Sequence, residues 1–291
     1  MTALSDLFRQ LDTPTLLLFC AFIGGIVGSF LNVVIYRLPL MMEREFTLFA
    51  KTHLQQPLAP EETQTFNLFR PASHCPKCRT PLNMRQNIPI FGYLLSGGKC
   101  RHCGQGFGGR YLRVECVTAV LFAAAAWRFG AGIALIGILA FTSALISLAE
   151  IDADTHYLPD QITLPLLWLG LLLNSDGLYV PLQSAVIGAA AGYLALWLPN
   201  AVFHKLTGQT GMGHGDFKLL AALGAWNGVE MLAFTVFAAS LAGLVAALLL
   251  RVKKGQYFAF GPALAVAGWC AAVFRTPIQT AFEYWLGNPI F

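Results

Sequence analysis

Charged residues are scarce in this sequence of 291 residues. Lys, Arg, Asp and Glu together make up only 12% of it, whereas hydrophobic residues make up 56% and the mean hydropathy is +0.60. So much apolar surface exceeds what a soluble core can bury, and the composition therefore predicts a protein in contact with membrane lipid. The net charge is only +4, and the basic residues follow the expected membrane topology rather than forming one patch, so we expect no nucleic-acid partner.

Internal repeats and low-complexity tracts are absent as well. Apolar blocks recur from Pro14 almost to the C-terminus, unlike the single short block of a secretory signal, so we expect membrane segments and no cleaved presequence. The pattern predicts an all-α polytopic membrane protein with about eight transmembrane segments. They are expected at 14–36, 114–127, 132–151, 161–173, 181–203, 217–227, 229–250 and 258–275. The blocks 161–173 and 217–227 are short enough to be partial or re-entrant helices.

One long polar stretch divides the sequence into three regions. We expect the first membrane segment to end at Arg37 and Pro39, which predicts an N-terminal segment (1–39), a polar domain (40–113) and a membrane domain (114–291). More than half of the Lys and Arg residues lie in the polar domain, and basic segments of membrane proteins stay in the cytoplasm. Eight crossings would then place the N-terminus outside. They would bring to the cytoplasmic face the polar domain and the loops at 152–160, 204–216 and 251–256.

Two acidic residues stand at the predicted cytoplasmic ends of apolar blocks. Asp152 follows the run at 145–149, and Asp216 follows a glycine-rich stretch at 211–215. A lone acid could merely end a helix in interfacial water, although ionisable groups near a bilayer usually face a polar cavity. Two carboxylates can hydrolyse a peptide bond, because an ionised partner activates water while a protonated partner donates a proton. The pair therefore predicts an aspartic peptidase with Asp152 and Asp216 as its catalytic residues.

The expected helix ends suggest different roles for the two acids. Asp152 is predicted at a helix C-terminus, whose dipole disfavours an anion, and Asp216 at an N-terminus, which favours one. Our hypothesis is therefore that Asp152 holds the proton and Asp216 is the base. Asp154 and Asp160 are rival acids, but we interpret Asp154 as a solvated loop group and Asp160 as the N-cap of the following helix.

Four of the seven cysteines form two CxxC pairs, at Cys75 and Cys78 and at Cys100 and Cys103. This spacing is close to that of four-thiolate zinc ribbons. Disulfides are the competing interpretation, but a reducing cytoplasm favours a metal or free thiols, and tetrahedral thiolate sites favour Zn²⁺. Because four Cys ligands leave no open position, we expect a structural zinc. His74 and His102 adjoin the ligands and are interpreted as solvent-facing neighbours.

Five short motifs occur in a fixed order: GSFLNV at 28–33, YRLP at 36–39, IDAD at 151–154, LPD at 158–160 and GHGDFKLL at 213–220. Together with the four-cysteine insert they resemble the type IV prepilin peptidases, which are GxGD membrane aspartic proteases. The resemblance extends over nearly the whole chain. It implies that the substrates are type IV prepilins and type II secretion pseudopilins, cut at the cytoplasmic face of the bacterial inner membrane between a short basic leader and a hydrophobic segment.

The same resemblance implies a second activity, because many members of that family N-methylate the new N-terminus with S-adenosylmethionine. The polar domain is too short for a Rossmann-type methyltransferase with its strand, glycine loop and helix. Candidate cofactor-binding residues are Gly98 and Lys99, before the second cysteine pair, and Glu115 at the entry to the next helix. The glycines at 97–98 could equally serve the turn into the cysteine loop.

Two other classes of function fit parts of the pattern. A proton-coupled membrane transporter would also use intramembrane acids, but it would be expected to show inverted repeats with broken helices in matching halves. A non-catalytic zinc-ribbon scaffold of a secretion complex would need only the four cysteines. In that case Gly24 and Gly28 would serve only as a small-residue packing face for another helix, a role that is equally compatible with the other functions.

Overall fold

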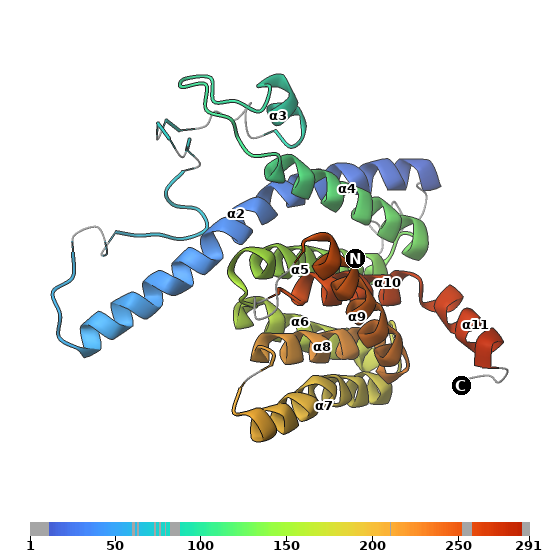
Figure 1. Cartoon of the computed structure of the whole chain (residues 1–291). Coiled ribbons are helices and arrows are strands. Elements are labelled where there is room, and N and C mark those ends of the chain that lie inside the picture. The colour runs from blue at the N-terminus through green and yellow to red at the C-terminus, as the bar shows by residue number, and fades with distance from the viewer. Residues whose placement is uncertain are drawn as a thin grey trace. The chain divides into compact units, whose positions relative to one another are not determined.

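The computed structural model describes a helical protein (Figure 1). It describes residues 12–59, 62, 64–72, 74–75, 77–78, 80–81, 88–209, 211–251 and 258–286. Among these residues there is no strand, and the extended backbone pairs only in two isolated bridges, His74 with Pro81 and Lys99 with Gly106. The chain divides into two compact units, 1–132 and 133–291.

The first unit is built on two long helices that lie side by side in Figure 1, α2 (Thr13–His53) and α4 (Arg110–Phe129), with the short α3 (Phe91–Leu95) between them in sequence. Their contact depends on glycine. A Cβ on Gly24 would lie 2.8 Å from the Ala119 Cα, and one on Gly28 would lie 2.8 Å from the Glu115 Cα. The small-residue packing face expected at Gly24 and Gly28 is therefore confirmed, because any larger side chain would push the helices apart.

Helix α2 is longer than the sequence predicted, because it does not end at Pro39 but continues to His53. An internal proline removes a backbone hydrogen bond and crowds the preceding turn, but the residues after Pro39 include Leu, Met, Glu, Arg, Ala and Lys, which favour helix. Tertiary contacts also hold this region. The buried Arg37 donates to the carbonyl oxygens of Asn67 at 3.0 Å and Pro71 at 2.6 Å, which ties the loop to the helix.

The second unit consists of α5 (Ile133–Thr155), α6 (Asp160–Leu173), η2 (Asn174–Asp176), α7 (Leu182–Thr207), α8 (His214–Asn227), η3 (Val229–Met231), α9 (Leu232–Leu249), α10 (Gly261–Val273) and α11 (Arg275–Leu286). Helix α8 forms its centre and packs against α6, α7 and α10 (Figure 1). From Leu219 to Asn227 every residue of α8 is buried. Glycines allow the closest approach, since a Cβ on Gly192 of α7 would lie 2.6 Å from the Leu220 carbonyl oxygen.

Within the described residues, four helices are long and apolar enough to cross a membrane: Thr13–His53, Ile133–Thr155, Leu182–Thr207 and Val229–Leu249. Each of the eight predicted segments coincides with a helix, but the other four are too short or too polar to count as spans, so the expected number of eight is not confirmed. The blocks predicted to be short are short, because α6 and α8 have 14 residues each. The N-terminal residues 1–11 and most of the predicted loop 251–256 lie outside the described residues.

Candidate active site and cysteine cluster

Asp152 lies in the last turn of α5, as the sequence predicted, and only 5% of it is exposed. Its carboxylate is held from another helix. The backbone N–H of Gly261, the first residue of α10, donates to Asp152 Oδ2 at 2.9 Å. A buried carboxylate oxygen that accepts a backbone N–H keeps a fixed orientation.

Asp216 lies in the first turn of α8, also as predicted. The loop before it is fixed by Asn200 of α7, whose Oδ1 accepts the backbone N–H groups of Gly211 at 3.0 Å and Met212 at 3.1 Å. The glycine after His214 is required by packing, because a Cβ on Gly215 would lie 2.8 Å from the Leu158 Cβ. Unlike Asp152, the buried Oδ1 of Asp216 has no hydrogen-bond partner within the described portion of the chain.

A cleft of about 190 Å³ joins the two acids. Its lining comes from the end of α5, the loop that leads into α6, the first residue of α6, and the start of α8 with the glycine before it: Asp152, His156, Tyr157, Leu158, Asp160, Gly213, His214, Gly215, Asp216 and Lys218. The fold thus brings the two predicted acids, 64 positions apart in the sequence, into one polar cleft. The rival Asp154 is exposed and does not line it.

Asp160 differs from its predicted role. Pro159 occupies the N-cap position of α6 and Asp160 is the first helical residue, with no capping hydrogen bond from its side chain. Its carboxylate instead accepts two hydrogen bonds from Lys218 Nζ, at 2.8 and 2.7 Å. The pair connects the start of α6 to the second turn of α8. Neither Lys218 nor Asn200 was identified from the sequence, because their partners lie 58 and 11 positions away without a periodic signal.

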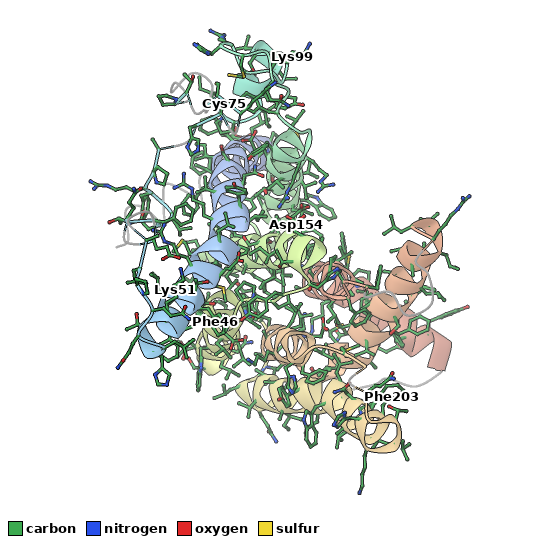
Figure 2. All side chains as sticks on the ribbon, turned by 60° about the vertical axis from the view of Figure 1, so that its left-hand side comes forward. Phe46, Lys51, Cys75, Lys99, Asp154 and Phe203 are labelled. Atoms are coloured by element: carbon green, nitrogen blue, oxygen red, sulfur yellow. The ribbon has the colours of Figure 1, made fainter. Side chains whose placement is uncertain are left out.

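The four predicted cysteines also come together. Their sulfur atoms all lie within 4.8 Å of one another, and this is the one group of potential metal ligands found among the described residues. Each pair sits in a tight turn, in which Cys75 N–H donates to the Thr80 carbonyl and Cys100 N–H to the Gln105 carbonyl. Figure 2 marks Cys75 and, close to it, Lys99 at the end of the first unit that carries α3. His74 and His102 are exposed, as expected, and stand outside the cluster.

The cysteine thiols differ in acidity. Hydrogen bonding with the Thr80 side chain and backbone lowers the pKa of the Cys78 thiol to about 6, and the backbone N–H groups of Cys103 and His102 lower the pKa of Cys100. A backbone N–H of Gln105 also favours the Cys103 thiolate, but burial and the neighbouring sulfurs raise the pKa of Cys103 to about 11. Thiolate is the form that binds metal. A bound cation would therefore displace the proton from Cys103 and stabilise all four sulfurs as thiolates.

Models of two known domain families match the chain. The Bacterial Peptidase A24 N-terminal domain matches residues 22–129, which include the cysteine cluster, and the Type IV leader peptidase family matches residues 139–248, which include both aspartates. This chain belongs to the type IV leader peptidase family. Proteins named prepilin leader peptidase/N-methyltransferase are similar to it over almost their whole length. The protein from Neisseria gonorrhoeae is 56% identical, and the match covers 93% of this chain and 94% of that protein. The protein from Dichelobacter nodosus is 44% identical, and the match covers 94% of this chain and 97% of that protein.

A third leader peptidase relative, from Pseudomonas putida, is 42% identical over 96% of this chain and 98% of its own, under the same name. No solved structure matches the chain significantly. The family assignment rests on both units, because each of the two matched domains falls within one of them.

In this leader peptidase chain, two of the three candidate cofactor residues are buried, Gly98 and Glu115, and the third, Lys99, has an exposed side chain. Gly97 and Gly98 adopt φ of +61° and +66°, which favours glycine, and a Cβ on Gly98 would lie 2.7 Å from the Tyr93 ring. Glu115 is buried, and its Oε2 accepts the backbone N–H of Ile90 at 2.7 Å. Lys99 is exposed (Figure 2). These contacts favour the interpretation of the glycines as turn residues.

The ion pair between Asp160 and Lys218 should make a small, measurable contribution to the stability of this leader peptidase. Its side chains are 32% and 44% exposed, so solvent screens it and we expect a coupling of at most about 1 kcal/mol. A double-mutant cycle with Lys218→Met and Asp160→Asn, followed by thermal unfolding in detergent, measures that coupling. Each single variant should cost stability, and the double variant should cost less than the sum. Strict additivity would mean that the pair does not hold α6 to α8.

Proposed function

We propose that this protein removes the leader peptide from type IV prepilins by aspartate-catalysed hydrolysis and then N-methylates the new N-terminus. The observation that carries the proposal is the cleft in which Asp152 and Asp216 meet at the ends of two helices. Membership of the type IV leader peptidase family and the name shared by the similar proteins support both activities. A transporter or a non-catalytic scaffold accounts for neither of these findings.

In the reaction we propose, the ionised aspartate accepts a proton from water as the water oxygen bonds to the scissile carbonyl carbon. The protonated aspartate donates its proton to the carbonyl oxygen. Collapse of the tetrahedral intermediate breaks the C–N bond, and a proton passes to the leaving amine. Asp152 and Asp216 are the catalytic residues in this proposal, and the Asp160–Lys218 pair keeps the start of α6 beside them.

The proposed substrates are prepilins and type II secretion pseudopilins, which place a basic leader before an apolar helix. The enzyme would act in the bacterial inner membrane, where a cleft at helix ends can receive a bond at the membrane surface. We further propose that the N-terminus lies outside and that the 40–113 domain and the cleft face the cytoplasm. The concentration of basic residues in that domain supports this orientation.

We propose that Cys75, Cys78, Cys100 and Cys103 hold one structural Zn²⁺. The sulfurs of Cys75 and Cys103 lie 3.7 Å apart and those of Cys78 and Cys100 lie 3.8 Å apart. Four thiolates placed tetrahedrally about 2.3 Å from a zinc ion would be separated by about 3.8 Å. A disulfide would require about 2.05 Å, so these distances favour the metal over the disulfide alternative.

Purified protein in lipid, incubated with a prepilin and S-adenosylmethionine, tests both activities in one experiment. Mass spectrometry of the product should show a mature chain that begins at the apolar segment and carries one additional methyl group. Omission of the methyl donor should leave cleavage intact. Recovery of uncut prepilin under conditions in which the protein remains folded would refute the proposal.

For methylation we propose that Lys99 contacts the cofactor, while Gly98 and Glu115 shape the surrounding loops. S-adenosylmethionine, when bound, supplies the methyl group, and an exposed cation beside a tight turn is suited to binding its carboxylate. Lys99→Ala should therefore reduce methylation about tenfold while cleavage remains within about twofold. Lys77→Ala, which removes an exposed lysine from the other cysteine loop, is the matched control and should leave both rates unchanged. Equal methylation by both variants would exclude Lys99.

A further inference from the structure

The first residue of α10 contacts the carboxylate of Asp152. Gly261 is the first residue of this helix, its N–H is 2.9 Å from Asp152 Oδ2, and both residues are buried. A Cβ on Gly261 would lie 2.6 Å from that oxygen and 3.0 Å from the carboxyl carbon. The carboxylate therefore occupies the space that any other side chain at position 261 would need.

The sequence around Gly261 makes it a specific donor. The first N–H groups of a helix have no partners within it, and Pro262 has no N–H to offer. The N–H of Gly261 therefore presents the positive end of the α10 dipole to the carboxylate of Asp152. A hydrogen bond to a charged group stabilises the charge by more than the exposed end of a helix dipole disfavours it, so this N–H outweighs the C-terminus of α5.

Asp216 has the opposite environment. Its Oδ1 is buried and has no partner among the described residues, although the carboxyl lies in the first turn of α8. An unpartnered buried oxygen is far more costly on an ionised carboxylate than on a neutral carboxyl. The contrast between the two acids thus favours the anion at Asp152 and the proton at Asp216.

We propose that Gly261 is a positioning residue for the cleavage reaction, whose backbone N–H orients Asp152 and holds it as the ionised base while Asp216 carries the proton. This reverses the division of roles expected from the helix ends alone. The inference rests on the proposed peptidase function and adds to it a third helix, α10, which supplies no side chain to the cleft.

Two alanine variants of α10 separate positioning from packing. Gly261→Ala would place its Cβ against Asp152. Gly268 lies in the same helix, α10, but away from the cleft, and Gly268→Ala would place its Cβ against the side chain of Leu223. We expect Gly261→Ala to lower kcat for prepilin cleavage about 10- to 100-fold, with KM within about twofold. Gly268→Ala should lower thermal stability but keep kcat within about threefold.

Isotope-edited infrared spectroscopy with labelled aspartate reports the proton directly. His156, His214, Lys218 and Asp160 also line the cleft, so all variants are compared at one fixed pH. The protonated carboxyl band of the wild type should be lost in Asp216→Asn. It should return in the double variant Gly261→Ala/Asp216→Asn, because the added Cβ pushes the Asp152 carboxylate away from the backbone N–H at position 261. Persistence of the band in Asp216→Asn would overturn the inference, and this result does not depend on whether Gly261→Ala folds.

The outcomes distinguish this inference from the proposed function. If Asp152→Asn and Asp216→Asn both still cleave prepilin, the peptidase mechanism itself is wrong. If both lose cleavage while Gly261→Ala and Gly268→Ala lower kcat equally, the peptidase mechanism stands and the positioning role of Gly261 is refuted.

Discussion

Replacement of either Asp152 or Asp216 by Asn is expected to lower kcat for prepilin cleavage by about 10³-fold or more. Asn has the shape of Asp but can neither take a proton from water nor donate one as an acid. Its amide oxygen can still accept the N–H of Gly261, so Asp152→Asn should fold normally. Initial rates measured by mass spectrometry of a prepilin substrate, with protein concentration checked by size-exclusion chromatography, give the ratio.

Two other aspartates serve as controls for this result. Asp154 is the sequence rival two residues from Asp152, and Asp176 lies in η2; both are exposed and neither lines the cleft. Asp154→Asn and Asp176→Asn should retain cleavage within about threefold, since neither carboxyl reaches the reacting bond. A loss in Asp154→Asn as deep as in Asp152→Asn would assign the catalytic pair differently.

The helices could be predicted from the sequence because apolar blocks report burial and lipid contact directly. All eight predicted segments coincide with helices, and the predicted acids and cysteines meet as expected. The composition could not settle which helices cross the membrane. Helix α8 is apolar because it is buried among other helices, and α4 begins with Arg110, Arg113 and Glu115. In the sequence, an apolar helix that is buried among other helices cannot be distinguished from one that faces lipid.

What the sequence could not reveal are contacts between distant positions. Gly261 lies 109 positions from Asp152, and only the folded chain shows that α10 points its N–H at the carboxylate. The sequence therefore predicts the roles of the two acids from their own helices alone and does not reveal the N–H that a neighbouring helix donates to Asp152. The sequence predicts Asp160 as a helix cap for the same reason, because its partner Lys218 lies 58 positions away.

Loss of the metal is expected to unfold the cysteine loops of the first unit. In the described residues between 64 and 109, the buried hydrophobic residues are Cys75 and Cys100, α3 has five residues, and the extended backbone makes only two isolated bridges. So small a core cannot offset the loss of chain entropy. Structural Zn²⁺ contributes an apparent 10–16 kcal/mol, roughly, in zinc-finger peptides at neutral pH, which is enough to order such loops.

Elemental analysis of the purified full-length protein should therefore find about one zinc ion per chain, and none in a Cys75→Ser/Cys100→Ser variant. That variant, or the wild type treated with a strong chelator, should be cut by protease within 64–109 at least tenfold faster, because cleavage follows the population of the open form. Cys116→Ser is the matched control, since this half-buried cysteine of α4 is not in the cluster, and it should keep both its zinc and its resistance. Resistance that survives complete removal of the metal would show that the loops are held by protein contacts alone, and the four cysteines would then need another explanation.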